Sequence, residues 1–268
     1  MPLNIVVCVK NTPTTSNVSI DPSSGKVKSA GLVFAMNPFD EFAVEEALRL
    51  KERLPASTAT ALTLGPETSE AVVRDAISRG CDAGVLVTGP EFAGGNSYAT
   101  SFALAAAVKK LNAQKPVHVV LFGKNTNDGN SGVVGAEVAA WLDWPGVISV
   151  KKIDSIDEKS ATVWRMMEDG IDVLKVSLPA AFSTTKEINV PRLASLKGKM
   201  NAKKAVIARW SASDLGLKTE EVHAALATTN VVRFSSPPSR PAGMRIEAAT
   251  SAEKAKKLVD ILIERKLI

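Results

Sequence analysis

The chain has 268 residues, of which 45% are hydrophobic and 23% are charged, and its formal net charge at pH 7 is +5. This is the composition of a globular protein with one sizeable core, and the apolar runs are far shorter than the ~20 residues of a membrane-spanning helix, so we expect no membrane insertion. The cationic stretch 186–204 holds no aromatic residue on which a base could stack, which disfavours nucleic acid as a partner.

The first 150 residues alternate between strand-like and helix-like patterns. Residues 4–9 form a continuous apolar run, typical of a strand buried on both faces, and residues 58–64, 83–88 and 117–122 are predicted as three further strands. Helical spacing of apolar residues predicts helices after Asn37-Pro38, over 69–79 and over 96–112. Strands that alternate with helices predict a mostly parallel sheet with flanking helices, in which a ligand binds beyond the carboxyl ends of the strands.

The rest of the chain breaks this alternation. Residues 18–27 read as a hairpin with a Pro-Ser-Ser-Gly turn, and residues 147–153 and 161–178 as antiparallel strands with a tight turn at Asp169-Gly170. Residues 251–265 form an amphipathic helix pattern. The stretch 183–250 has little regular pattern, and because a compact domain rarely carries so long a loop, we expect it to wrap a partner.

The cysteines and histidines are few. Cys8 and Cys81 each lie beside an apolar run, and we expect buried free thiols in a reducing compartment. His118 and His223 are the only histidines in the sequence, and no cluster of Cys and His residues exists, so neither a metal site nor a histidine-based hydrolase is indicated. The apolar run that starts at residue 4 follows no charged leader, so we expect neither export nor a cleaved transit peptide.

Three loops between a strand and a helix are candidates for ligand binding. The loop 123–135 consists of small and polar residues, and Asn130 or Ser131 could cap the helix that follows, leaving backbone N–H groups free for a phosphate. It carries neither a Walker sequence nor GxGxxG, so an ordinary polar connection is the alternative. The loops 92–101 and 36–41 also open helices, and capping alone would explain them.

Three helix N-termini at one sheet edge predict a nucleotide phosphate site. These loops supply no set of nucleophile, base and orienting group, so their residues do not indicate bond chemistry of their own.

The order and spacing of many short segments carry a family resemblance. They are Val9-Lys10, Pro13, Val18–Asp21, Met36–Glu52, Phe92–Gly94, Ala99–Ser101, Gly123-Lys124, Asp128-Gly129, Leu142–Pro145, Lys186–Met200, Ala202–Lys204, Pro237-Pro238 and Ala242-Gly243. Together they cover nearly the whole chain and resemble the beta subunits of electron transfer flavoproteins.

The resemblance implies a Rossmann-like fold with a small antiparallel addition and an extended C-terminal arm. It also implies a heterodimer in which a larger alpha subunit carries most of the redox FAD site. The beta subunit would bind AMP in typical members, or a second FAD that accepts hydride from NADH in electron-bifurcating members. Its domains would be 1–182 for the nucleotide, 183–250 as the docking loop and arm around the alpha subunit, and 251–268 as a terminal helix.

By resemblance, particular residues take on roles. The nucleotide pocket is expected at Cys8, Asn37, Pro38, Phe39, Asp40, Leu64, Gly123, Lys124, Asn125, Thr126, Asn127, Asp128, Gly129, Asn130, Ser131, Gly132, Val133 and Val134. Docking of flavin dehydrogenases is expected at Leu196, with Lys197, Lys199 and Met200 around it. An apolar side chain within a basic rim suits docking, because charges steer the encounter while the buried side chain supplies contact energy.

Departures from the family patterns leave the identity of the bound nucleotide undecided between AMP and FAD. Bifurcating members usually have Asp-Thr where Asn96-Ser97 stand here, and Asp-Thr-Ala-Gln where Asn130–Val133 stand. The AMP branch usually has Thr at the position of Val134. AMP and a second FAD are therefore both retained, and a stand-alone adenine-nucleotide-binding regulatory protein of similar fold is the alternative function. The expected location is the cytoplasm, or the mitochondrial matrix in a eukaryote.

Overall fold

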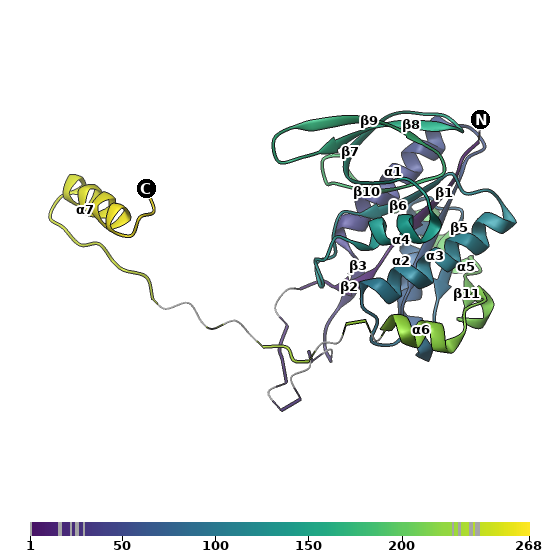
Figure 1. Cartoon of the computed structure of the whole chain (residues 1–268), viewed down its shortest axis with the longest axis horizontal. Helices are drawn as coiled ribbons and strands as arrows, with labels where there is room; N and C mark the ends of the chain where they lie inside the picture. The colour runs from purple at the N-terminus through teal and green to yellow at the C-terminus, as the bar shows by residue number, and fades with distance from the viewer. Residues whose placement is uncertain are drawn as a thin grey trace. The chain divides into compact units, whose positions relative to one another are not determined.

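The computed structural model describes residues 2–15, 18–21, 23–24, 27–28, 30–226, 228–229, 232–235, 238 and 242–268. The chain divides into two compact units, one formed by Met1–Ser19 with Val27–Val232 and the other by Ile20–Lys26 with Arg233–Ile268. The elements are labelled in chain order in Figure 1. No helix in the described ranges combines the length and the apolar character needed to cross a bilayer.

A sheet of nine strands forms the centre of the larger unit. In chain order the strands are β1 (Asn4–Cys8), β4 (Thr58–Leu64), β5 (Ala83–Val87), β6 (Val119–Gly123), β7 (Gly146–Ile156), β8 (Ser160–Met166), β9 (Ile171–Ser177), β10 (Ala180–Thr184) and β11 (Ala208–Trp210). Their spatial order is β11-β5-β4-β1-β6-β10-β7-β8-β9. Neighbours from β11 to β7 are parallel, whereas β8 pairs antiparallel with both β7 and β9.

The predicted mostly parallel α/β fold with a small antiparallel addition is confirmed. The four strands predicted in the first half of the chain correspond to β1, β4, β5 and β6. Their buried side chains pack on both faces of the sheet. The antiparallel strands are present as well, and the turn at Asp169-Gly170 closes with a bond from the Met167 N–H to the Gly170 carbonyl at 2.9 Å.

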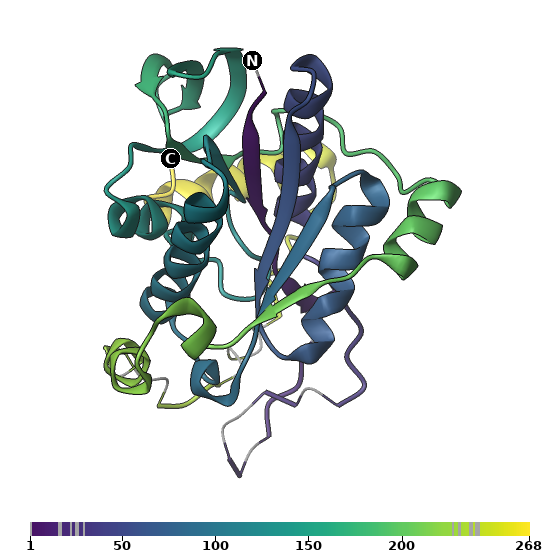
Figure 2. The same cartoon turned by 90° about the vertical axis from the view of Figure 1, so that its right-hand side faces the viewer.

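Helices cover both faces of the sheet, as Figure 2 shows. α1 (Pro38–Arg53) and α2 (Glu70–Arg79) pack on one face, and α3 (Ser97–Gln114) and α4 (Val134–Leu142) on the other, each over its own apolar core. Short 3₁₀ turns η1 (Glu67–Ser69), η2 (Pro90–Phe92) and η3 (Ser213–Leu215) join them. The helix predicted after Asn37-Pro38 is present, with Asn37 at the N-cap position, Pro38 as the first helical residue and acidic residues in the first turn, although the Asn37 side chain makes no capping hydrogen bond.

A second, two-stranded sheet pairs β2 (Asn11–Pro13) antiparallel with β3 (Phe34–Met36). The hairpin predicted between them, at residues 18–27, is only partly visible. The Lys28 N–H donates to the Ser19 carbonyl at 2.9 Å, but Pro22 and Gly25 of the predicted turn lie outside the described residues.

The prediction of little regular structure over 183–250 is wrong for its first part. β10 crosses the expected boundary at residue 182, and α5 (Leu196–Lys204), β11 and α6 (Thr219–Leu226) follow within the larger unit. The sequence gives weak signals here because β11 is three residues long and the only buried residue of α5 is Ala202. These elements have no strong apolar periodicity of their own, and contacts with α2 and β5 stabilise them instead.

In the smaller unit, the predicted terminal helix is confirmed as α7 (Ser251–Glu264). A capping box starts it: the Thr250 hydroxyl accepts from the Glu253 N–H, and the Glu253 carboxylate accepts from the Thr250 N–H, both at 3.3 Å. Its apolar residues Leu258, Val259 and Ile263 are exposed within this unit.

Candidate functional site

The strand order places one edge of the sheet where a ligand site is expected. From β1 the chain passes through α1 to β4 and β5 on one side, and then returns through α3 to β6 on the other side of β1. The order therefore reverses between β1 and β6. In open α/β sheets, ligands bind at this point, outside the carboxyl ends of the strands.

A cavity of about 470 Å³ lies at this edge, within the size range of small-molecule sites. Cys8, Leu64 and Gly123, the last residues of β1, β4 and β6, form part of its wall. Further apolar wall comes from Phe92, Leu104 and Phe122, whereas the loop after β6 contributes polar groups. A ligand with a flat apolar part and an anionic part would match this division.

Asp40, in the first turn of α1, ties together the segments around the cavity. Its carboxylate accepts from the Lys10 N–H at 2.7 Å and from the Asn37 side-chain amide at 2.9 Å, and it also accepts from the backbone N–H of Gly123. Burial raises the pKa of Asp40 to about 7, although these hydrogen bonds oppose the shift. The buried carboxylate therefore braces the ends of β1 and β6 against α1.

Asn37 and Asp128 hold the loop after β6 in place. The Asn37 amide donates to the Asn125 carbonyl at 2.8 Å, and its side-chain oxygen accepts from the Asn127 N–H at 3.2 Å. Asp128 pairs with the Lys10 ammonium at 2.7 Å. Hydrogen bonds from Lys10 and Thr126 lower the pKa of Asp128, and they outweigh its partial burial. The loop is thus preorganised by groups that lie behind the cavity wall.

The N-termini of α3 and α4 differ in how their backbone donors are satisfied. On α3, the Asn96 side chain caps the helix by accepting from the Ala99 N–H at 2.8 Å. On α4, Val133 is the N-cap, and within the described part of the chain no side chain caps the helix. The cap expected from Asn130 or Ser131 is therefore wrong. The positive φ angles of Asn130 and Gly132 turn the chain in this loop ahead of the N-cap.

The first turn of α4 consequently offers backbone donors to the cavity. Val134 and Gly135 line it, together with Ser131 and Gly132 of the preceding loop. An uncapped helix N-terminus combines unpaired N–H groups with the positive end of the helix dipole, which favours an anion such as a phosphate. Of the three predicted helix N-termini, this is the one best suited to a phosphate.

The structure brings most of the predicted pocket residues together. Those that line the cavity are Cys8, Asp40, Leu64, Gly123, Lys124, Asn125, Thr126, Gly129, Ser131, Gly132 and Val134. Among the described residues, those predicted but placed outside its wall are Asn37, Pro38, Phe39, Asn127, Asp128, Asn130 and Val133. Of these, Asn37, Asn127 and Asp128 act through the hydrogen bonds given above.

Six wall residues lie in the predicted loops 92–101 and 123–135, namely Phe92, Gly95, Asn96, Ser97, Thr100 and Gly135. Sequence reasoning missed five others, which are Val9, Lys10, Leu104, Phe122 and Thr229. Thr229 gave no signal, because the segment after α6 reaches the site through the Asn96 amide, which donates to the Thr228 hydroxyl at 3.0 Å.

The predicted docking residues form a separate feature. Leu196, Lys197, Lys199 and Met200 lie on α5, which packs on α2. The side chains of Leu196 and Met200 are 78% and 55% exposed, so α5 presents apolar groups to its surroundings.

Comparison with known proteins decides the family. The model of the electron transfer flavoprotein domain matches residues 25–215. The chain belongs to the electron transfer flavoprotein family. It is 36% identical, over 99% of its length and 100% of the relative's, to the protein named caffeyl-CoA reductase-Etf complex subunit CarD of Acetobacterium woodii. It is 34% identical to the electron transfer flavoprotein subunit beta of Thermoanaerobacterium thermosaccharolyticum, over 99% of this chain and 100% of that one.

A further relative is Protein FixA of Azotobacter vinelandii, which is 33% identical over 82% of this chain and 79% of its own. These similarities bear out the resemblance to beta subunits, and family membership supports a role in electron transfer. The matches to the first two relatives extend over 99% of the chain, so they take in the cavity, α5 and the terminal helix alike.

The two cysteines of this flavoprotein-family chain are both buried free thiols, as predicted. Burial is the main cause that raises the pKa of Cys8, and the nearby Asp40 carboxylate adds to it. Burial likewise raises the pKa of Cys81 to about 12. Both side chains therefore remain protonated thiols near neutral pH, which makes them poor nucleophiles and poor redox groups.

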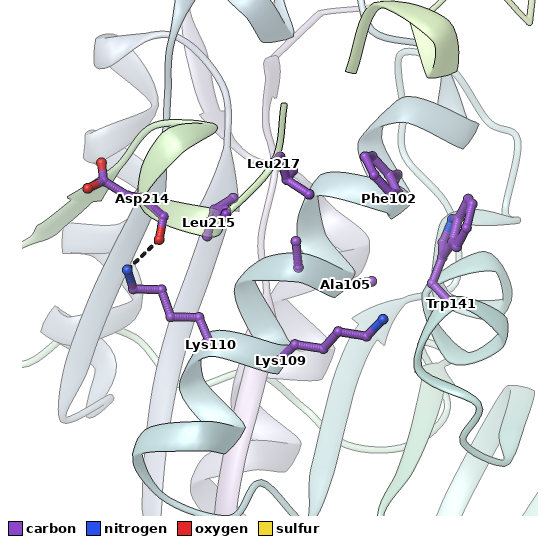
Figure 3. Close-up of a pocket in the computed structure, with 10 residues that line it drawn as sticks. Phe102, Ala105, Lys109, Lys110, Trp141, Asp214, Leu215 and Leu217 are labelled. Carbon is purple, nitrogen blue, oxygen red and sulfur yellow. Dashed lines mark hydrogen bonds between the residues drawn. The ribbon is translucent and has the colours of Figure 1, made fainter. Parts of the chain in front are cut away.

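A second hollow, of about 360 Å³, lies on the outer side of α3 and is shown in Figure 3. Its walls are Phe102 and Trp141, whose rings meet edge to face at 5.1 Å, together with Leu215 and Leu217. Lys110 donates to the Asp214 carbonyl at 2.5 Å. These contacts join η3 to α3 and α4, so we assign the hollow to packing.

Gly123 is expected to be essential to the wall of the main cavity. A Cβ at this position would lie 2.6 Å from the carbonyl carbon of Phe39 and 2.8 Å from the backbone nitrogen of Asp40. Because backbone atoms cannot move aside easily, Gly123→Ala is expected to lower the free energy of unfolding by about 1–3 kcal/mol, as measured by urea denaturation.

The matched control is Gly170→Ala in the turn between β8 and β9, where an added Cβ meets no atom within 4 Å. That change should alter stability by less than about 0.5 kcal/mol. Equal unfolding midpoints for the two variants would contradict the close approach of β6 to α1.

Proposed function

We propose that this chain is the small subunit of a heterodimeric electron transfer flavoprotein and that its cavity retains an adenine nucleotide. A larger alpha subunit would supply most of the redox FAD site. The observation that carries the proposal is the uncapped N-terminus of α4 at the cavity, at the point where the strand order reverses.

The residues of the cavity fit an adenylate. The phosphate would lie against the loop 131–132 and the first turn of α4, where two glycines allow close approach to the backbone. Lys124 adds positive charge to the wall. The adenine ring would pack against Leu64, Phe92 and Phe122, which supply apolar surface on the same cavity.

Both AMP and FAD contain this adenylate, so the proposal includes either in the beta-subunit site. FAD supplies the redox chemistry, since it can take up and release electrons. The residues of this chain would bind and orient the nucleotide. A second FAD, with NADH as hydride donor, would make the protein electron-bifurcating, whereas AMP would give it a structural nucleotide.

The same proposal assigns α5 and its surroundings to docking of flavin dehydrogenases. The exposed Leu196 begins α5, and Lys197, Lys199, Lys203 and Lys204 follow it in the same helix. A partner with an acidic rim around an apolar pocket would therefore be steered by the charges and held by the leucine. Two buried free thiols suit a reducing compartment, and we place the protein in the cytoplasm, or in the mitochondrial matrix of a eukaryote.

The test is to co-express the chain with its alpha subunit, purify the complex and count the nucleotides released on denaturation. We expect a yellow heterodimer that releases either one FAD and one AMP or two FAD. A colourless monomer without flavin or adenylate would overturn the proposal. A homodimer that retains adenine nucleotide without flavin would instead identify a stand-alone regulatory protein.

A further inference from the structure

The segment that connects β10 to β11 has two distinct sides. We call residues 186–206 the docking strap. Its most exposed apolar side chains, between 55% and 92% accessible, are Val190, Leu193, Leu196, Met200 and Val206. Its polar and backbone groups bond to the outer surfaces of α1 and α2, so the strap is attached on one side and presents apolar groups on the other.

Arg192 makes the densest attachment. Its guanidinium donates to Glu45 at 2.8 and 3.0 Å and to Glu52 at 2.5 and 3.0 Å, and its backbone N–H donates to Glu45 at 3.0 Å. Glu45 is only 6% exposed. A planar guanidinium held by two carboxylates is fixed in orientation as well as position. This anchor lies between Val190 and Leu193, next to the apolar side chains that project outward.

Attachments to α1 continue before Arg192. The Asn189 amide donates to the Phe42 carbonyl at 3.0 Å and to Glu46 at 3.1 Å. Arg49 donates to the Ile188 carbonyl at 3.1 Å. The buried Ile188 side chain packs into the core of the same sheet face. The start of the strap is therefore fixed to α1 just before its exposed apolar residues begin.

The second half of the strap is fixed on α2. Arg79 donates to the Arg192 carbonyl at 3.3 Å, and Arg74 donates to the carbonyls of Ala202 and Ala205. At Gly198, an added Cβ would lie 2.9 Å from the carbonyl carbon of Ser78, so α5 approaches the end of α2 as closely as its backbone allows. Polar bonds, in place of extensive apolar burial, hold the strap.

From this arrangement we propose that Glu45 and Glu52, acting through Arg192, are positioning residues that hold the docking strap ready for an electron-transfer partner. The proposal rests on the docking role given under Proposed function. Glu45 is buried beneath Arg192 and Glu52 is engaged by the same guanidinium, so both would act on the strap through Arg192. A strap fixed before binding avoids the loss of conformational entropy that ordering it on the partner would cost. The apolar side chains then meet an acidic-rimmed pocket without rearrangement.

The test uses the double variant Glu45→Gln/Glu52→Gln in the intact heterodimer, with the flavoprotein as the varied substrate of a flavin dehydrogenase. We expect KM for the flavoprotein to rise about tenfold while kcat changes by less than about twofold, because binding and not the electron transfer step is impaired. Flavin and adenylate content should stay the same. Trypsin cleavage after Lys197 and Lys199 should become faster, because the strap is released.

Two further variants keep the test interpretable. Arg192→Lys retains the charge but not the paired geometry, and we expect a smaller rise in KM, of about threefold; it also serves if the double variant fails to fold. Glu67→Gln is the matched control, because Glu67 pairs with Arg209 of β11 at 3.2 Å. It should leave both KM and trypsin cleavage unchanged.

Leu196→Ala in the same assay separates the two proposals. If Leu196→Ala raises KM while the double variant and Arg192→Lys leave both KM and trypsin cleavage as in the wild type, the positioning role is overturned and docking stands. If Leu196→Ala also leaves KM unchanged, the docking role itself is lost. Equal falls in kcat and flavin content would show a structural defect, which likewise overturns the positioning role.

Discussion

Replacing Ser131 with aspartate is expected to exclude the adenine nucleotide from the cavity without destabilising the fold. Ser131 lines the cavity next to the uncapped N-terminus of α4, and its side chain is exposed. A carboxylate about 5 Å from a phosphate repels it by roughly 3 kcal/mol at an effective dielectric constant of about 20, which corresponds to about a 100-fold loss of affinity. The same carboxylate near the start of a helix is mildly favourable, by about 0.3–1 kcal/mol.

The measurement is titration of AMP and of FAD into the nucleotide-stripped heterodimer, combined with urea unfolding of the same samples. Ser131→Asn is the matched control, since it has nearly the same size as aspartate but no charge, and it should bind within about threefold of the wild type. Unchanged affinity in Ser131→Asp would show that the phosphate does not lie against α4. A parallel loss of affinity and stability would show instead that the loop had collapsed.

Shortening Leu196 to alanine is expected to slow electron transfer between this protein and its dehydrogenase. Leu196 is the first residue of α5, it is 78% exposed, and basic residues follow it in the same helix. A central apolar anchor typically contributes about 2 kcal/mol or more to an interface, so kcat/KM for the flavoprotein should fall roughly 30-fold. The loss should appear mainly in KM, because the flavin is untouched.

The control for this variant is Val173→Ala, which shortens a 60% exposed apolar side chain on the edge strand β9. Its kcat/KM should stay within about twofold of the wild type. Flavin and adenylate content, determined on the same preparations, should be identical for all three proteins. If Leu196→Ala transferred electrons as fast as Val173→Ala, α5 would not be the docking surface. Raising the salt concentration should weaken docking of the wild type, because the basic rim steers the encounter.

Local patterns sufficed to predict the elements that carry their own signal. β1, β4, β5 and β6 are rich in apolar residues because both faces of the parallel part of the sheet are buried. The start of α1 is indicated by Asn37-Pro38 and by the acidic residues of its first turn. α5 and β11 could not be predicted in this way, because contacts with α2 hold α5 and pairing with β5 holds β11, and those contacts join residues far apart in the chain.

The residues of the site likewise divide into those predictable from local sequence and those placed by the tertiary structure. The sequence by itself determined which loops are small, polar and placed after buried strands, and hence that 123–135 and 92–101 would meet at one sheet edge. Only the tertiary structure decided that Asn37, Asn127 and Asp128 brace the wall from behind, that α4 is left uncapped, and that Thr229 closes the cavity. The physical reason is that strand and helix patterns follow from local burial, whereas the direction of a polar side chain depends on which distant donor or acceptor the fold places beside it.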